Sequence, residues 1–315
     1  MRKKIFISIA SYCDPLLWWT VQSAWEAAKS PSDIYFGVVD QSSSRASDLL
    51  LSGWSKQLRY LHVEARDSRG ACWARSIAFG LHTDEDYLLQ IDSHTFFERS
   101  WDERLIEMLE EISIRSSNQK IIVSTRPFAF EFPMPNKISI KRHTLESIVL
   151  QPKANSTIDY ENPIILFDGV PSGKEHPVIG YQLAAGFIFT RSSFIDEVPY
   201  DPHLYFHGEE QNLSIRAFSR GWDIWHPNAP PLYHKYKRHE DEKHVMHWDA
   251  VFEKVRDVRW TELQKASRRR MQRLLFDGAD LGSFGLGAVR TLDEFCMLSG
   301  IDYLGRRISC GKSKA

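Results

Sequence analysis

The residues best suited to chemistry follow an apolar run at residues 87–91, where Asp92 and His94 stand two positions apart. Side chains at i and i+2 of an extended segment point to the same side, so both can reach one divalent ion. A carboxylate oxygen with an imidazole nitrogen suits Mn²⁺ best and is compatible with Mg²⁺, whereas Zn²⁺ would need a cysteine or a second nearby histidine. The pattern predicts a metal site at a strand end. The ordinary alternative is an Asp that caps a turn beside a surface histidine.

Two further carboxylates, Glu209 and Glu210, open a predicted helix. The helix dipole favours negative charge there in any protein, so the pair is either an N-terminal charge preference or a grip on substrate hydroxyls. Adjacent helical residues point about 100° apart, so we expect one of them to face a pocket and the other to be solvated or paired with an arginine. The dipole also favours the ionised form, which argues against a general-acid role.

Two segments carry side chains suited to a nucleotide. The first predicted strand, at residues 4–10, runs into the polar turn 11–15, which is a candidate nucleotide pocket. Residues 66–75 place arginines, including Arg69 and Arg75, around a helix start, where guanidinium and backbone N–H groups favour phosphate. An ordinary surface loop with salt bridges is the alternative. Neither GxGxxG nor GxxxxGK[ST] occurs, so dinucleotide and P-loop sites of the usual kind are unsupported.

One later histidine is a further candidate ligand. His234 ends a short extended piece in the segment LYHKY. The chain contains 12 histidines, three of them just downstream, so the residue pattern alone does not single out His234. Cys72 has no partnering histidine by spacing, and we interpret it as a small buried apolar residue.

The elements that must position these residues alternate between short apolar runs and helix-like stretches over the first 125 residues. This alternation is typical of βαβ units and a mainly parallel sheet. In an open α/β sheet, ligands bind outside the carboxyl ends of the strands, where Asp92 and His94 fall. The predicted strands cover residues 4–10, 34–39, 58–64, 87–91 and 120–124, and the predicted helices cover residues 15–29, 70–81 and 101–115.

The remainder of the chain is predicted to be less regular at first. Seven prolines between residues 126 and 180 indicate a loop-rich substrate region. A strand follows at 182–190, where Gly186 suggests the close approach of another backbone. Gly221 is the expected end of the helix that starts at Glu209. Further expected elements are extended pieces at 222–225 and 231–234, one or two charged helices over 240–276, and a helix at 292–298.

Composition excludes several protein classes. The 315 residues allow about two domains, or one large α/β domain with an appendage. Lys and Arg number 40 against 41 Asp and Glu, a formal charge of −1, whereas a general nucleic-acid binder would show a basic excess. The apolar run at residues 5–10 is too short for a signal peptide, and no window approaches the roughly 18 apolar residues of a membrane span.

Cysteines and basic clusters bear on location and partners. The four cysteines lie far apart without CxxC spacing, so neither a zinc knuckle nor a disulfide framework is indicated, and we expect a reducing cytoplasm. Peripheral membrane contact stays open through two basic clusters, although such clusters are usually solvated faces. The cysteines are Cys13, Cys72, Cys296 and Cys310, and the basic residues are Arg268, Arg269, Arg270, Arg306, Arg307, Lys312 and Lys314.

Seven segments are more specific in combination than any one alone. They are IASYCDP at 9–15, GACWAR at 70–75, LQIDSHTFF at 89–97, AAGFIFTRS at 184–192, the stretch 206–227, LYHKY at 232–236 and VRTLDEFCMLSGID at 289–302. In this order they resemble the GlcNAc-transferase family, whose eukaryotic members are cytoplasmic enzymes that add α-N-acetylglucosamine from UDP-GlcNAc to hydroxyproline on a ubiquitin-ligase adaptor protein. The resemblance implies an α/β fold of the GT-A type, Rossmann-like with a C-terminal helical extension, and a retaining reaction.

Carried over position by position, the resemblance also implies site residues. Asp92 and His94 look like an Asp-x-His version of the Asp-x-Asp motif and, with His234, like ligands of a Mn²⁺ that bridges the donor diphosphate. Glu209 and Glu210 match the acidic helix start that faces sugar or acceptor in this fold and are the candidate catalytic residues. The remaining residues expected to bind the UDP-sugar are Ala10, Ser11, Tyr12, Asp40, Arg69 and Arg75, with Asp92 contributing again.

These expectations give one reading of the chain. Residues 1–236 form a GT-A catalytic domain, with a donor-binding part at 1–125 and an acceptor part at 126–236, and residues 237–315 form a helical extension. The function is metal-dependent retaining transfer of a sugar, above all GlcNAc, from a UDP-sugar to a hydroxyl of a protein or polysaccharide acceptor on the cytoplasmic side. The alternatives are a non-catalytic module that binds sugar nucleotides or glycans, and a metal-dependent hydrolase on the same ligands.

Overall fold

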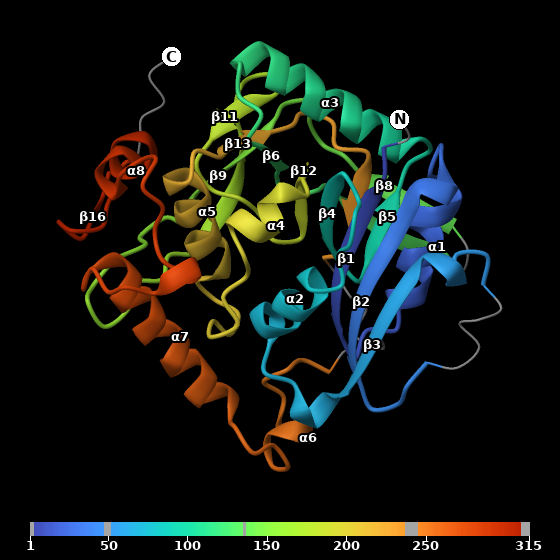
Figure 1. Cartoon of the computed structure of the whole chain (residues 1–315), viewed down its shortest axis with the longest axis horizontal. Coiled ribbons are helices and arrows are strands. Elements are labelled where there is room, and N and C mark those ends of the chain that lie inside the picture. The colour runs from blue at the N-terminus through green and yellow to red at the C-terminus, as the bar shows by residue number, and fades with distance from the viewer. Residues whose placement is uncertain (1–2, 47–51, 135–136, 237–244, 310–315) are drawn as a thin grey trace.

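A computed structural model describes residues 3–46, 52–134, 137–236 and 245–309, and a mixed sheet forms its centre. The strands of this sheet are β1 (Ile5–Tyr12), β2 (Ile34–Ser42), β3 (Leu58–Glu64), β4 (Tyr87–Asp92), β6 (Ile121–Ser124), β11 (Val178–Gly180), β12 (Phe187–Arg191) and β13 (Asp223–His226). Their order is β11-β13-β6-β12-β4-β1-β2-β3 (Figure 1). The neighbours β4, β1, β2 and β3 run parallel, whereas β12 is antiparallel to both β4 and β6.

The register of the parallel strands sets the position of the predicted site. Ala10 pairs with Asp92 across β1 and β4, and Ser11 pairs with Asp40 across β1 and β2. The carboxyl ends of three strands therefore meet at one edge of the sheet, where ligands bind in open α/β sheets. The five strands predicted over the first 125 residues correspond to β1, β2, β3, β4 and β6.

Helices cover both faces of the sheet because alternate strand residues point to opposite sides. On one face, Ile5, Ile7 and Ile9 pack in one cluster with apolar residues of α1 and α3, whereas Phe6 packs on the other face with residues of α2, α4 and α5. The first helix begins only at Leu17, so Pro15 lies in the turn before it. The bounds are α1 (Leu17–Ala27), α3 (Trp101–Ser116), α2 (Ala71–Phe79), α4 (Ser193–Glu197) and α5 (Glu209–Ser219).

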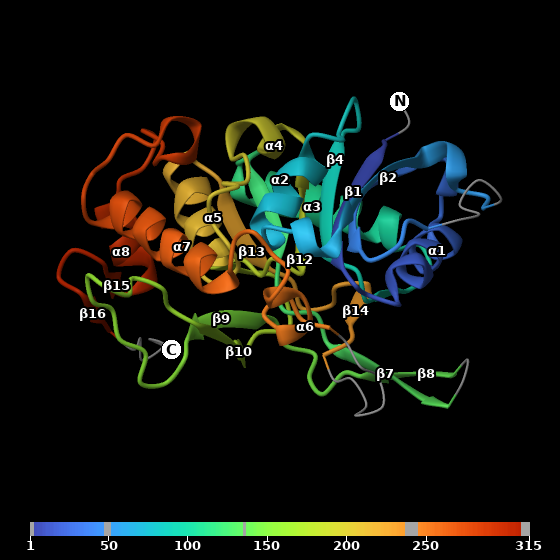
Figure 2. The ribbon, with the colours of Figure 1, turned by 90° about the horizontal axis from the view of Figure 1, so that it is seen from below.

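A small second sheet contains the first three residues of the LYHKY segment. Its order is β5 (Thr95–Phe97), β14 (Leu232–His234), β7 (Ala129–Met134) and β8 (Lys137–Lys141), and a separate pair joins β9 (Ile148–Pro152) to β10 (Phe167–Pro171). β14 runs antiparallel to β5, with His234 opposite Thr95. Figure 2 shows the β7–β8 hairpin extending away from the central sheet. The region predicted to be loop-rich therefore contains several short strands.

The C-terminal part packs at the end of the molecule opposite α1 (Figures 1 and 2). Met271, Leu274 and Phe295 belong to the same core cluster as residues of α5. The prediction of long helices over 240–276 is correct only for its second half: residues 240–244 lie outside the described part, and 245–259 hold a single four-residue helix. The bounds are α6 (Ala250–Glu253), α7 (Trp260–Leu275), α8 (Leu292–Ser299), β15 (Ile301–Asp302) and β16 (Arg307–Ile308).

In the part of the chain that the structure describes, none of these helices has the length and apolar character needed to cross a membrane.

Candidate active site

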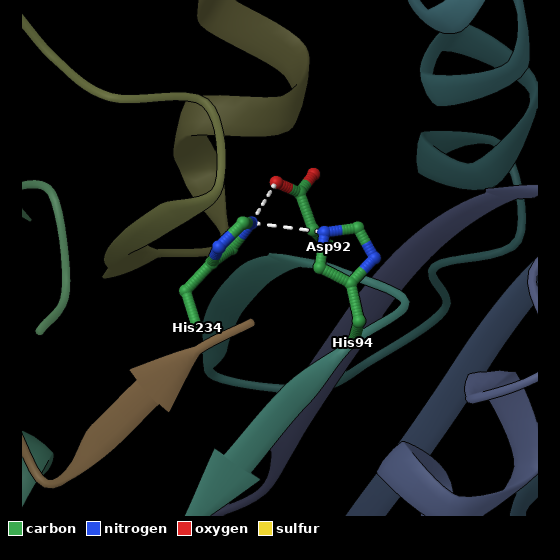
Figure 3. A group of neighbouring side chains, drawn as sticks. All are labelled: Asp92, His94 and His234. Carbon is green, nitrogen blue, oxygen red and sulfur yellow. Dashed lines mark hydrogen bonds and ion pairs between the residues drawn. The ribbon is translucent and has the colours of Figure 1, made fainter. Parts of the chain in front are cut away.

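Three potential metal ligands converge beyond the carboxyl end of β4. Asp92 ends the strand, His94 follows two residues later, and His234 is delivered by β14 (Figure 3). One ligand atom of each lies within 4.8 Å of those of the other two. His234 Nε2 lies 3.0 Å from Asp92 Oδ2 and 3.0 Å from His94 Nε2. The pairing of β14 with β5 places His234 here, because it sets His234 opposite the residue that follows His94.

A buried carboxylate orients His94. Asp14 Oδ2 lies 2.6 Å from His94 Nδ1 and also accepts a hydrogen bond of 2.7 Å from Ser93 Oγ. Its side chain is only 2% exposed. An imidazole that donates its Nδ1–H to a carboxylate keeps Nε2 as the free lone pair, the arrangement common behind metal-bound histidines. The sequence analysis did not select Asp14 as a site residue, although it lies in the polar turn after the first strand.

Asp92 is held in its ionised form. Its second oxygen, Oδ1, accepts a hydrogen bond of 2.6 Å from Arg75 Nη2. Burial by itself would raise the pKa of Asp92, but the hydrogen bond with His234 and the charge of Arg75 outweigh burial and hold that pKa well below its usual range. The carboxylate is therefore charged at any pH at which the protein is folded and available as a ligand.

Gly186 leaves room for this carboxylate. A Cβ atom at position 186 would lie 2.7 Å from Asp92 Oδ2, closer than real Cβ atoms come to another atom. The sequence analysis expected another backbone to approach Gly186. The structure corrects that expectation, because a side-chain carboxylate occupies the space instead.

The donor set fits a divalent transition-metal ion. With Nδ1–H of His94 engaged by Asp14, its Nε2 lone pair points at His234 Nε2, 3.0 Å away, and the Asp92 carboxylate lies beside both. Converging lone pairs repel one another unless a proton or a cation lies between them. Two imidazole nitrogens and one carboxylate oxygen suit divalent ions of the first transition series, Zn²⁺ as well as Mn²⁺. Among the described residues, no other group of three or more has this character.

Arg75 connects this cluster to the start of α5. Its Nη2 bonds Asp92 and its Nη1 bonds Glu209 Oε1. The side chains of Arg75 and Glu209 are 7% and 5% exposed, so this ion pair is buried. Glu209 is therefore the member of the acidic pair that meets an arginine. Both terminal nitrogens of Arg75 already bond carboxylates. Arg75 therefore holds Asp92 in place, and neither of these nitrogens is left to bind a phosphate.

Glu210 has a different environment from its neighbour. Its Oε1 accepts a hydrogen bond of 2.8 Å from the Ala185 backbone N–H. Burial raises the pKa of Glu210 to about 7; the Ala185 hydrogen bond opposes this rise, and the charge of Glu209 adds to it. Burial thus opposes the effect of the helix dipole at Glu210, which was expected to favour the ionised form.

Two cavities share a wall made of these residues. The first has a volume of about 310 Å³ and the second about 440 Å³. Four residues line both: Arg75, Asp92, Phe206 and His234. Glu209 and Glu210 line only the second cavity. A molecule in the first cavity and one in the second would therefore meet at the candidate metal ligands.

Of the residues expected to flank a nucleotide, some line the first cavity and their neighbours along the strand point away from it. Ala10 and Tyr12 line it, whereas Ser11 is buried between them and its carbonyl accepts a hydrogen bond of 2.9 Å from Gln41 Nε2. On β2 the lining residue is Gln41, which the sequence analysis missed. The carboxylate of its neighbour Asp40 instead accepts a hydrogen bond of 2.9 Å from the Tyr60 hydroxyl.

In the segment before α2, too, the cavity is lined by neighbours of a predicted residue rather than by that residue itself. Ser68, Gly70 and Ala71 line the first cavity, whereas the side chain of Arg69 is exposed. Gly70 has φ +100°, and a Cβ there would meet the Tyr205 ring at 2.5 Å, so the tight turn needs a glycine. Of the two arginines expected near a phosphate, only Arg75 reaches the wall of the cavity.

A late segment of the chain closes one side of the first cavity. Met246, His247 and Trp248 line it, although no sequence pattern placed them at the site. His247 Nδ1 lies 2.9 Å from the Tyr205 hydroxyl, and its Nε2 lies 3.1 Å from the Ser68 carbonyl oxygen. These long-range polar contacts explain why residues 245–249 do not continue a helix despite their helical spacing of apolar residues.

Comparison with solved structures bears on the fold. A crystal structure of GalNAc-T7 with UDP, GalNAc and Mn²⁺ is similar with a TM-score of 0.59 at 16% identity, covering 93% of this chain and 54% of that one. S. aureus TarS is similar with a TM-score of 0.49 at 12% identity, covering 74% of this chain and 36% of that one. TarS 1–349 in complex with UDP is similar with a TM-score of 0.47 at 12% identity, covering 74% of this chain and 61% of that one. The chain spans about half the length of GalNAc-T7, and the likeness shows a GT-A fold.

The family follows from the sequence itself. The profile of the family described as Glycosyltransferase (GlcNAc) matches residues 4–53 and 50–304, so the chain belongs to that family. The description of the family is that of a glycosyltransferase, which supports transfer of a sugar as the activity. No curated protein matches the chain.

Proposed function

We propose that this glycosyltransferase depends on a metal ion, retains the anomeric configuration, and moves GlcNAc from UDP-GlcNAc to a hydroxyl of a protein or glycan. The proposal rests on the convergence of Asp92, His94 and His234 at the wall shared by the two cavities. The description of the family supports GlcNAc as the sugar. The presence of UDP and Mn²⁺ in the GalNAc-T7 structure supports a UDP-sugar and this metal.

In this proposal the first cavity receives UDP. Ala10 and Tyr12 contact the uridine, and Gln41 offers an amide beside them. Ser11 and Asp40 support this wall from behind, Ser11 through its bond to Gln41 and Asp40 through Tyr60. Arg75 acts through Asp92, and Arg69 lies at the exposed rim.

Asp92, His94 and His234 would hold the metal ion, with Mn²⁺ favoured over Mg²⁺ because two of the three ligand atoms are nitrogens. When bound, the ion supplies a Lewis acid that neutralises charge on the departing UDP. Asp14 keeps His94 Nε2 aimed at the site, and Arg75 holds the second oxygen of Asp92. The ligands are thus fixed before substrate arrives, which lowers the reorganisation needed during the reaction.

The chemical step is a displacement on one face of the sugar. The acceptor hydroxyl oxygen bonds to C1 as the bond from C1 to the UDP oxygen breaks, and that departing oxygen takes the hydroxyl proton. Glu210, on the wall of the second cavity, orients the acceptor or, when ionised, stabilises positive charge on the sugar ring. Glu209 positions Arg75.

The chain is divided accordingly. We assign donor binding to residues 1–125, acceptor binding to 126–236 and cover of the donor cavity to the C-terminal extension 237–315, which supplies His247 and Trp248. We place the reaction in a reducing cytoplasm, because the three described cysteines are free thiols.

The test measures UDP release from UDP-GlcNAc with Mn²⁺ and after chelation, for the wild type and for Asp92→Ala and His94→Ala. Matched controls are Asp257→Ala and His176→Ala, which remove the same side chains at exposed positions outside the site. We expect both site variants to lose Mn²⁺-stimulated release while keeping the wild-type melting temperature, and both controls to behave as the wild type.

Product analysis separates transfer from hydrolysis. With acceptor present, the proposal predicts α-linked GlcNAc on the acceptor. Free GlcNAc formed at the same rate with and without acceptor would indicate the hydrolase alternative, and metal-independent transfer would contradict the metal site.

A further inference from the structure

A basic groove runs along the exposed side of α7. Its volume is about 590 Å³, and three of its lining residues are cations, Lys265, Arg268 and Arg269, against one acid, Glu161. The formal charge of the whole chain is −1, so this groove is a local concentration of positive charge. The other lining residues are Trp260, Thr261, Gln264 and Gln272.

The three cations differ from the arginine beside them. Arg270 Nε lies 2.6 Å from Asp201 Oδ2, and the two side chains are 14% and 0% exposed, so Arg270 is committed to the interior. Lys265, Arg268 and Arg269 are exposed, and none has an ion-pair partner among the described residues. The run 268–270, interpreted from sequence as one basic cluster for membrane contact, is therefore split between an internal ion pair and the groove.

The helix that forms the groove, α7, contacts the wall of the second cavity of the active site. His207 lines that cavity, and Ser267 Oγ on α7 donates a hydrogen bond of 3.3 Å to its carbonyl oxygen. Burial and the charge of Arg268 lower the pKa of His207. On the opposite wall, Gln272 Nε2 donates a hydrogen bond of 2.7 Å to the Tyr160 carbonyl oxygen, next to Glu161.

Cations also line the second cavity. Arg126 Nη1 and Lys153 Nζ both lie 3.6 Å from Asp168 Oδ1, so two positive charges share one carboxylate. Cations therefore line both the acceptor side of the transfer site and the groove on α7, and α7 contacts His207 between them.

We propose that the acceptor is an anionic glycan, whose phosphate or carboxylate groups bind along this groove while its reacting hydroxyl lies in the second cavity. The inference rests on the proposed function and adds the chemical class of the acceptor. Guanidinium groups bind phosphate and carboxylate in a bidentate manner. Thr261, Gln264 and Gln272 offer hydrogen bonds to hydroxyl groups, and Trp260 offers a flat apolar face with an N–H.

A glycan fits this groove better than the other polyanions. A membrane surface would contact protruding side chains, whereas these cations line a hollow. A peptide would be expected to use a free strand edge or apolar side-chain pockets, but the groove is formed on a helix and its lining is mostly polar.

The experiment compares K265A/R268A/R269A with a control, K56A/R99A/K174A, which removes three exposed cations elsewhere on the chain. Binding to the full chain is measured for a glycerol phosphodiester oligomer, oligogalacturonate and neutral dextran, each at low and high salt. Poly-glutamate and phosphatidylglycerol vesicles test the peptide and membrane alternatives. UDP release from UDP-GlcNAc with Mn²⁺ and no acceptor is measured for every variant.

We expect at least one of the two anionic oligomers to bind the wild type and the control equally, to bind K265A/R268A/R269A about tenfold or more weakly, and to lose affinity as salt rises. Which oligomer binds more tightly identifies phosphate or carboxylate as the source of charge. Equal binding by both variants, equal binding of dextran, or tighter binding of poly-glutamate or vesicles would overturn the proposal. Acceptor-free UDP release should be equal in the wild type and both variants; failure of the wild type to bind UDP-GlcNAc in the presence of Mn²⁺ would instead contradict the proposed function.

Discussion

The transfer site has a donor side around the first cavity and an acceptor side around the second cavity. The two sides differ in how their charges are balanced. On the donor side, the charged groups are paired: Arg75 bonds Asp92 and, from the wall shared with the second cavity, Glu209, and Asp14 holds His94. On the acceptor side, Arg126 and Lys153 share a single carboxylate, and burial raises the pKa of Glu210 to about 7. The donor side is thus preorganised for one kind of ligand, whereas the acceptor side keeps charged groups with which a substrate can pair.

The difference follows from the elements that build each side. Three parallel strand ends, fixed by the pairs Ala10–Asp92 and Ser11–Asp40, form the donor side. The acceptor side is assembled from short strands, loops and the start of α5. If the contrast is correct, substitutions on the donor side should cost more activity than substitutions on the acceptor side.

The largest expected effect is at His234, the metal ligand that comes from the second sheet. His234→Ala should reduce Mn²⁺-dependent turnover by about 10³-fold or more, as much as His94→Ala, because loss of a metal ligand removes several kcal/mol of charge stabilisation. Steady-state kinetics with saturating UDP-GlcNAc checks this. Turnover of His234→Ala near the wild-type level would show that the second sheet supplies no ligand and would break the account of a site shared between two sheets.

The next effect tests the packing behind Asp92. Gly186→Ala would place a Cβ 2.7 Å from Asp92 Oδ2, and the bonds from Arg75 and His234 prevent that carboxylate from moving aside. We expect turnover to fall about 10²-fold, with the fold retained in far-UV circular dichroism. Unchanged Mn²⁺ affinity and turnover in this variant would show that the Asp92 carboxylate can move aside, which would contradict a preorganised donor side.

A smaller effect is expected at Asp14, which bonds His94 but is not itself a candidate metal ligand. Asp14→Asn removes the charge that fixes the His94 tautomer, and losses behind a metal-bound histidine are typically about 10- to 100-fold in metal affinity or activity. Titration of activity with Mn²⁺ should show a raised half-saturating concentration, with partial recovery at high Mn²⁺. The exposed substitution Asp257→Asn is the matched control, and equal titration curves for the two variants would contradict the role given to Asp14.

The smallest effect concerns the stability of the acceptor side. The folded pKa of Glu210, about 7, lies above its usual 4.5, so between these pH values the folded state binds more protons than the unfolded state. Stability therefore falls as pH rises through this window. Glu210→Gln cannot ionise and keeps an oxygen for the Ala185 N–H, so its melting temperature relative to the wild type should increase from pH 5 to pH 8. A constant difference across that range would contradict the raised pKa.

The donor side was also the easier side to predict from sequence. Its strands are continuous apolar runs, and the end of such a run marks where a ligand binds, so Asp92 and His94 could be selected from local pattern alone. Alternation along a strand was harder to use: the predicted residues included Ala10 and Tyr12, which line the cavity, but also Ser11 and Asp40, which do not, and Gln41 was missed. A one-residue shift at a strand end exchanges the two faces of the sheet.

The other residues of the site depend on contacts between distant parts of the chain. His234 reaches the site only through the pairing of β14 with β5, and local pattern could not distinguish it from the other histidines; the family resemblance could. Asp14 and His247 act through partners 80 and 179 residues away. The helical spacing around residues 245–255 predicted a helix, but polar contacts to Tyr205 and Ser68 hold that segment against the donor cavity instead.

The central claim, that Asp92, His94 and His234 bind one ion together, is tested most directly by Mn²⁺ binding in the presence of UDP. Electron paramagnetic resonance of free Mn²⁺ gives the dissociation constant for the wild type, the three single alanine variants and the control His176→Ala. The account predicts a single site whose affinity falls at least about tenfold in each of the three variants and is unchanged in the control. Wild-type affinity in His234→Ala, with loss in the other two variants, would contradict it.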